Sequence, residues 1–178
     1  MKTNILLWVL CFSLACYGQD KYYTKSGNIT FESSVPSFEE VKATNTKVTA
    51  VLKEDGAIAA LALNKAFGFK IALMEEHFNE NYVESETYPK ATFRGGFVEI
   101  PEDLSQEKEV IVNGIMDFHG VQKEMEVPVR LQVQDEVLVG ESGFVLLCSD
   151  FGIKIPKIVS DKLANEIQVT IKAALTKI

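Results

Sequence analysis

Histidine chemistry in this chain can come only from His77 and His119. His77 stands between Glu76 and Glu80 in a segment with helical spacing, where a general base or a single metal ligand could be built. A zinc site requires three or four converging ligands, and no second histidine or cysteine lies near His77 in the sequence. His119 precedes Gly120 between two predicted strands, which predicts a turn residue. We expect no catalytic residue and no bound metal; an enzyme that uses His77 as a base is the less favoured alternative.

Nucleophilic and phosphate-binding motifs are equally weak. Cys148 closes an apolar strand pattern, and such a cysteine is more often a small buried hydrophobe than a nucleophile. The chain has no Gly-x-Ser-x-Gly elbow, and Arg94-Gly95-Gly96 lacks the spacing and the lysine of a phosphate loop. We therefore expect a binding protein rather than an enzyme.

Aromatic and soft apolar side chains are what the sequence supplies in quantity. Phe67-Gly68-Phe69 places two rings on one face with no side chain between them, which would suit the wall of a hydrophobic tunnel. His77, Asn81 and Tyr88 could orient a polar group at its mouth. The alternative use of most of these side chains is an ordinary packed core. The predicted ligand-binding residues are Phe67, Phe69, Leu73, Met74, His77, Phe78, Asn81, Tyr88, Phe93, Met116, Phe118, Phe144, Leu146 and Phe151.

Strands must position these residues, because alternation of apolar and polar residues dominates the chain. Asp55-Gly56 predicts a tight hairpin turn between two of them. Pro128 indicates an edge or a bulge and leaves open a homodimer formed through that edge. Many long alternating strands favour an all-β fold, an eight-stranded closed antiparallel barrel without exposed edges. The predicted strands are 27–34, 48–53, 57–63, 90–100, 108–118, 121–133, 137–148 and 167–175.

One helix interrupts the strands at about 71–83. Its apolar stripe consists of Ile71, Met74, Phe78 and Tyr82, which recur at helical spacing, with acidic and amide side chains opposite. A single amphipathic helix in a strand series either covers a barrel mouth or packs on the outside of the sheet.

The N-terminus predicts export. Lys2 precedes an apolar run over residues 5–15, too short for a transmembrane helix but typical of a signal peptide. Cleavage after Gly18 would divide the chain into a signal peptide, 1–18, and one domain, 19–178, that is periplasmic or secreted. The alternative is a lipoprotein anchored at Cys16, because Ser13-Leu14-Ala15-Cys16 loosely resembles a lipobox.

The net charge and the hydropathy of the chain limit the kinds of partner that we expect. The net charge is −7, which argues against nucleic-acid binding, since phosphate backbones are bound by clustered positive charge. After removal of residues 1–18, no apolar run reaches transmembrane length, so we expect no integral membrane span.

Several segments, taken in order, resemble the YceI-like family of exported lipid-binding proteins. The amino-acid sequence of the predicted helix is similar to that of members from Bacteroidetes-type bacteria. One departure is that many members carry an arginine before the Asp-Phe-Gly turn, where this chain has Cys148 and Ser149. The segments that carry the resemblance are 77–93 with its Tyr88-Pro89 and Phe93, 113–121, Val127-Pro128-Val129, Ser149-Asp150-Phe151-Gly152, and 165–173.

The resemblance implies a lipocalin-like barrel around an elongated apolar cavity. Its ligand would be a long apolar molecule, a polyisoprenoid such as a polyprenyl quinone or phosphate, held for transport, storage or sensing. It implies a binding module, with no cofactor other than such a lipid. A structural or interaction barrel with a filled core is the alternative that the residues leave open.

Overall fold

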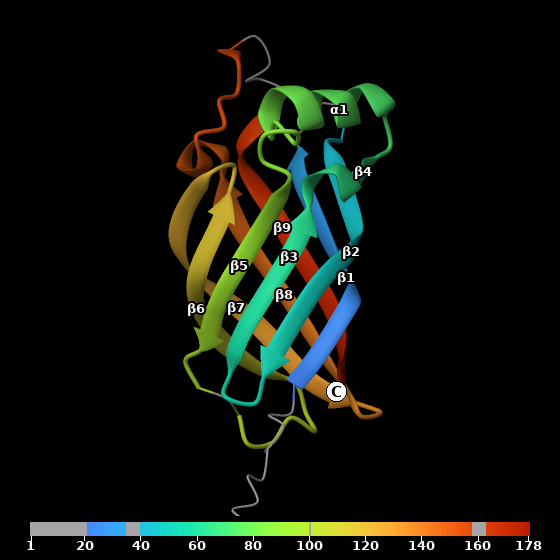
Figure 1. Cartoon of the computed structure of the whole chain (residues 1–178), viewed down its shortest axis with the longest axis vertical. Coiled ribbons are helices and arrows are strands. Elements are labelled where there is room, and N and C mark those ends of the chain that lie inside the picture. The colour runs from blue at the N-terminus through green and yellow to red at the C-terminus, as the bar shows by residue number, and fades with distance from the viewer. Residues whose placement is uncertain (1–20, 35–39, 100, 158–162) are drawn as a thin grey trace, which may run out of the picture.

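The computed structural model describes residues 21–34, 40–99, 101–157 and 163–178. Within these residues, eight long antiparallel strands form one barrel (Figure 1), which confirms the predicted all-β fold. A two-residue strand, β4 (Gly68–Phe69), adds to one rim. The long strands are β1 (Lys21–Ser34), β2 (Lys42–Lys53), β3 (Ala57–Leu63), β5 (Lys90–Phe97), β6 (Lys108–Phe118), β7 (Val121–Gln134), β8 (Val137–Leu147) and β9 (Leu163–Lys177).

Pairing between the first two strands closes the barrel. The sheet runs β1-β9-β8-β7-β6-β5-β3-β2, and β1 pairs with β2 again through partners such as Phe31↔Ala43. Closure satisfies the backbone groups that an open sheet would expose at its edges.

Pro128 does not lie on an edge strand, so that part of the prediction is wrong. β7 lies between β6 and β8, and Pro128 pairs with Ile111 of β6. The register between β7 and β8 runs from Val129↔Ser142 to Gln134↔Val137, so Pro128 stands where this pairing ends. There the Ser142 hydroxyl donates a hydrogen bond to the Pro128 carbonyl at 2.6 Å. A residue without an N–H is tolerated at such a position.

The predicted helix is present and covers one end of the barrel (Figure 1). It consists of α1 (Ala72–His77) and a π-helical turn, η2 (Phe78–Tyr82), closed by a hydrogen bond from Val83 N–H to the Phe78 carbonyl at 2.9 Å. Met74, Phe78 and Tyr82 are half-buried, whereas Glu76 and Glu80 are exposed. The apolar stripe therefore faces the barrel. We call this the helix-covered end.

The opposite end holds a packed apolar core, and most of its buried residues also face the barrel interior described below. Leu104 of the loop between β5 and β6 packs against it, and the Leu104 carbonyl accepts a hydrogen bond from Val133 N–H at 2.8 Å. The C-terminus also lies at this end (Figure 1). We call this the packed end; its buried residues are Ala50, Leu52, Val110, Leu131, Leu138 and Leu175.

The predicted signal peptide, 1–18, and the alternative anchor Cys16 lie outside the described residues. Among the described residues, no helix is long and apolar enough to cross a membrane.

Candidate ligand-binding site

A cavity of about 590 Å³ lies inside the barrel. Its volume falls in the range of pockets that hold small-molecule ligands. Toward the helix-covered end several inward side chains are only half-buried. The half-buried residues that line the cavity there include Phe93, Met116, Phe118, Met125, Phe144 and Leu146.

Four phenylalanine rings form a cluster beneath the helix. Phe31 of β1 is central: its ring centroid lies 5.3 Å from that of Phe67, 5.7 Å from that of Phe69 and 5.3 Å from that of Phe78. Phe78 also lies 5.1 Å from Phe69 and 5.8 Å from Phe67. These separations are those of stabilising aromatic pairs. The cluster thus joins α1–η2 to the barrel wall, and all four rings line the cavity.

A second aromatic contact lies near the end of β6. Phe118 and Phe151 are 5.5 Å apart, and both line the cavity. Phe151 belongs to the 3-10 turn η3 (Cys148–Phe151) that follows β8 and is 1% exposed.

All the predicted ligand-binding residues except Leu73, Asn81 and Tyr88 line the cavity. Leu73 is 56% exposed on the solvent side of α1, out of phase with the buried stripe, and Asn81 is also exposed. Tyr88 packs against the His119 ring at 4.5 Å instead. These three residues are therefore not brought to the cavity wall.

Sequence reasoning missed two cavity residues of consequence. Phe31 continues the inward alternation of Gly27 and Ile29 in β1, so its position could have been predicted from the strand pattern. Asn64 lies in the 3-10 turn η1 (Asn64–Ala66) after β3, and no pattern in the sequence singled it out.

Few polar groups reach the cavity. Tyr82 and Cys148 both line it. Burial first, and the proximity of Cys148 second, raises the pKa of the Tyr82 phenol. Burial likewise raises the pKa of the Cys148 thiol. Both groups are therefore held in their neutral forms, which suits an apolar cavity.

His77 lines the cavity but is itself exposed. No hydrogen bond or ion pair in the described part of the chain joins it to a carboxylate, and these residues contain no cluster of three His, Cys, Asp or Glu side chains that could hold a metal. The groups needed for catalysis by His77 do not converge on it here.

The rim at the helix-covered end is fastened by the hairpin between β6 and β7. His119 has a φ of 51° and lies in the hairpin turn, as predicted. Its Nδ1 lies 2.9 Å from the Phe151 carbonyl oxygen and its Nε2 lies 3.0 Å from Glu84 Oε2. Lys123 pairs with Asp150 beside them. The turn thus links the segment after η2 to η3.

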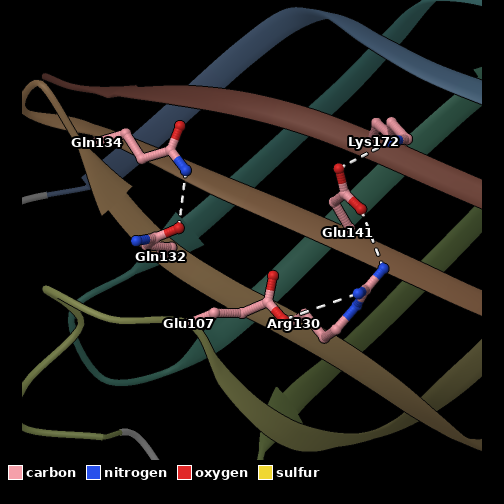
Figure 2. Close-up of polar contacts among 6 residues, drawn as sticks. All are labelled: Glu107, Arg130, Gln132, Gln134, Glu141 and Lys172. Atoms are coloured by element: carbon pink, nitrogen blue, oxygen red, sulfur yellow. Dashed lines mark hydrogen bonds and ion pairs between the residues drawn. The ribbon is translucent and has the colours of Figure 1, made fainter.

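Charged side chains lie on the outer face of the barrel (Figure 2). Glu141 of β8 accepts hydrogen bonds from Lys172 Nζ at 2.8 Å and from Arg130 Nη2 at 3.1 Å. Arg130 also pairs with Glu107 at 3.7 Å. Lysine holds the pKa of the Glu141 carboxyl below its usual value, mainly through the hydrogen bond from Lys172. Charged side chains therefore pair with one another outside the barrel, whereas apolar side chains dominate its interior.

The amino-acid sequence that forms this barrel matches a known family model. The YceI-like domain model covers residues 22–175. The chain belongs to the YceI-like family. The family assignment agrees with the resemblance noted in the sequence. No curated protein matches the chain.

Solved structures with the YceI-like architecture are similar to this barrel. A polyisoprenoid binding domain from Saccharophagus degradans, implicated in plant cell wall breakdown, has a TM-score of 0.76 at 12% identity, covering 89% of this chain and 99% of that one. BcnA from Burkholderia cenocepacia has a TM-score of 0.71 at 16% identity, covering 84% and 96%. A Campylobacter jejuni YCEI protein has a TM-score of 0.57 at 14% identity, covering 85% and 84%. At these identities the likeness shows a shared fold.

Proposed function

We propose that this YceI-like protein holds a long apolar ligand, a polyisoprenoid or a similar lipid, in its barrel as a carrier, store or sensor. The observation that carries the proposal is the cavity of about 590 Å³ with half-buried inward side chains. A filled scaffold would bury those side chains against one another. The description of the S. degradans relative as a polyisoprenoid binding domain supports the same ligand class.

Hydrophobic burial can supply the affinity. Each CH₂ group removed from water contributes about 0.8 kcal/mol, so a branched hydrocarbon chain needs few hydrogen bonds to bind. The Phe31–Phe67–Phe69–Phe78 cluster offers aromatic surface at the helix-covered end. Binding, rather than chemistry at His77, is therefore the role that the interior favours.

Export completes the proposal. Lys2 and the apolar run over 5–15 support processing after Gly18, and lipidation at Cys16 is the alternative. The intact mass and the N-terminal sequence of the protein from a periplasmic or membrane fraction distinguish the two. A mature chain that still begins at Met1 would contradict export.

Extraction and mass spectrometry of the purified protein test the binding role. We expect a co-purifying polyisoprenoid or a similar lipid, and we expect Met125→Trp, which places a larger side chain in the cavity, to weaken its binding. Ile115→Trp is the matched control, because Ile115 is 45% exposed on the outer face. Binding of an isoprenoid alcohol added to the delipidated protein should follow the same order. Absence of a lipid together with failure to bind any added isoprenoid would refute the proposal.

A further inference from the structure

The ring of His119 lies between two hydrogen-bond acceptors. Its Nδ1 is 2.9 Å from the Phe151 carbonyl oxygen, and its Nε2 is 3.0 Å from Glu84 Oε2. A backbone carbonyl and an ionised carboxylate can only accept. Both ring nitrogens must therefore donate if the two hydrogen bonds are to form together.

Only the imidazolium ion carries a proton on both ring nitrogens. A neutral imidazole carries one, so in either tautomer the other nitrogen would turn a lone pair toward an acceptor. With the proton on Nδ1 the lone pair faces Glu84, and with the proton on Nε2 it faces the Phe151 carbonyl. The arrangement around His119 is thus that of the charged form, and loss of its proton removes one of the two bonds.

The surroundings of the ring supply one carboxylate in direct contact. The His119 side chain is 12% exposed, and the centroid of the Tyr88 ring lies 4.5 Å from that of the imidazole. Asp150 is paired with Lys123, so it is Glu84 that bonds to the ring. The titratable groups closest in sequence to these contacts, on the elements that meet at His119, are Glu84 and Glu86 after η2, Tyr88 before β5, Asp117 of β6, Lys123 of β7, and Cys148 and Asp150 of η3.

His119 joins three segments at the helix-covered end. Glu84 follows η2 by two residues, Phe151 ends η3, and His119 lies in the turn between β6 and β7. Val83, the residue before Glu84, lines the cavity, as Phe151 does. The four-phenylalanine cluster holds the helix against β1 and β4, so the His119 ring supplies a second attachment of the same cover.

We propose that His119 is a pH-sensitive latch for the helix that covers the cavity. The protonated ring holds Glu84 and the Phe151 carbonyl together, and loss of the proton releases one of them. Histidine is the side chain whose charge ordinarily changes between about pH 5 and 8. Because the closed arrangement needs the proton, the link is complete in mild acid and is lost as the pH rises, and access to the cavity rises with it. The latch goes beyond the lipid-binding role and does not depend on which ligand the cavity takes.

Amide hydrogen exchange followed by NMR, at about pH 5.5 and about pH 7.5, tests the latch in the purified protein. The Val83 N–H, bonded to the Phe78 carbonyl at 2.9 Å, reports on the cover. The Val133 N–H, bonded to the Leu104 carbonyl at 2.8 Å, reports on the packed end and is the internal control. After correction for the intrinsic exchange rate at each pH, protection of the Val83 amide should fall roughly tenfold as the pH rises, the size expected for one lost hydrogen bond to a charged group. Protection of the Val133 amide should not change.

Glu84→Gln separates the latch from a merely structural contact. The glutamine amide can donate to an unprotonated Nε2 while Nδ1–H donates to the Phe151 carbonyl, and it can turn to accept from the imidazolium. Both links then form at either pH, so the Val83 amide should keep its protection at the higher pH. His119→Asn tolerates the φ of 51° but is too short to reach both partners, so it should lose protection at both pH values. His77→Gln, at the other histidine, should retain the pH dependence of the natural chain.

The natural chain alone also decides the proposal, even if a variant does not fold. The nitrogen chemical shifts of the His119 ring should show two protonated nitrogens at the lower pH, and loss of one proton should coincide with the fall in Val83 protection. Equal protection of the Val83 amide at both pH values would overturn the latch, as would a pH dependence that persists unchanged in Glu84→Gln. An equal fall in the protection of Val133 would also overturn it, because the whole barrel rather than the cover would then respond to pH.

Discussion

The two ends of the barrel treat the same kinds of side chain differently. β8 contributes Leu138 to the packed end, where it is 2% exposed, and Leu146 to the helix-covered end, where it is half-buried, although both line the cavity. Both leucines point inward from one strand. The difference shows that the inward alternation makes the barrel, whereas the filling is decided separately at each end.

The reason lies in what closes each end. At the packed end, Leu104 from a neighbouring loop joins leucine and valine side chains that meet across the barrel axis. At the helix-covered end, the four-phenylalanine cluster gathers on the β1 and β4 side, beneath the helix, while the inward residues of β5 to β8 remain half-buried. The helix therefore contacts the barrel through this cluster, and the cavity remains beside β5 to β8.

Leu138→Ala and Leu146→Ala test this comparison most directly. In the ligand-free protein, Leu138→Ala should lower the free energy of unfolding by about 3–5 kcal/mol, because it removes a side chain that is 2% exposed within the apolar core. Leu146→Ala should cost about 1 kcal/mol, since that side chain has few contacts to lose. Chemical denaturation measures both. Equal losses would show that the helix-covered end is packed as tightly as the other.

Gly120→Ala tests how the cover is fastened. Gly120 has a φ of 74°, and a Cβ there would lie 2.7 Å from Tyr88 Cε1. Gly152, the matched control, has a φ of 70° with nothing within 4 Å of such a Cβ. We expect a loss of about 1 kcal/mol for Gly152→Ala and about 2–3 kcal/mol for Gly120→Ala, because only the latter displaces Tyr88. Equal losses would mean that the Tyr88 contact does not matter.

The reactivity of Cys148 measures how accessible the cavity is at the helix-covered end, and no substitution is needed. Since burial raises the pKa of its thiol, less thiolate is present at a given pH, and alkylation by iodoacetamide should be several-fold slower than in the denatured protein at pH 8. A ligand in the cavity should slow the reaction further. Peptide mass spectrometry resolves this cysteine from the others. A rate equal to that of the denatured chain would contradict its burial.

The strands could be predicted from alternation, but several of their ends could not, those of β1 and β2 among them. β1 begins at Lys21 rather than 27, and β2 begins at Lys42 rather than 48. These added segments are rich in polar residues, and they are strands because they pair with a neighbour, as Thr24↔Ala50 and Thr30↔Thr44 do. Pairing partners far along the chain cannot be read from local periodicity.

Site residues could be predicted where a local sequence pattern, such as the helical stripe, fixes their position. They could not be predicted where a distant segment fixes it. The helical stripe that contains Met74 and Phe78 gave the correct phase, and Leu73 fell outside that stripe. The placement of Asn64 in the barrel wall depends on its side-chain amide donating to the Tyr88 carbonyl, 24 residues along the chain. That arrangement is a tertiary property, and the residue type alone does not reveal it.

The smallest effect is expected outside the barrel, at Glu141, which lies on β8 between Leu138 and Leu146 but faces outward (Figure 2). Lys172→Met should raise the pKa of Glu141 toward its usual value, because the largest cause of its lowered pKa is the hydrogen bond from Lys172. Carboxyl resonances followed by NMR during a pH titration measure the shift. Gln134→Ala, which removes only an uncharged contact to Gln132 on the same outer face, is the control and should leave the titration unchanged.

The lowered pKa of Glu141 also fixes how its contribution to the free energy of unfolding changes with pH. A lowered carboxyl pKa contributes stability above the usual pKa, and this contribution is lost as the pH falls through the native value. The Lys172→Met protein and the natural chain should therefore differ slightly near neutral pH and converge in acid. Because the pair lies in solvent, added salt should shrink the difference. If the two ends differ only in how their interiors are filled, this variant should leave lipid binding and the Leu138–Leu146 contrast as they were; a change in either would mean that the outer charges help to hold the cavity open.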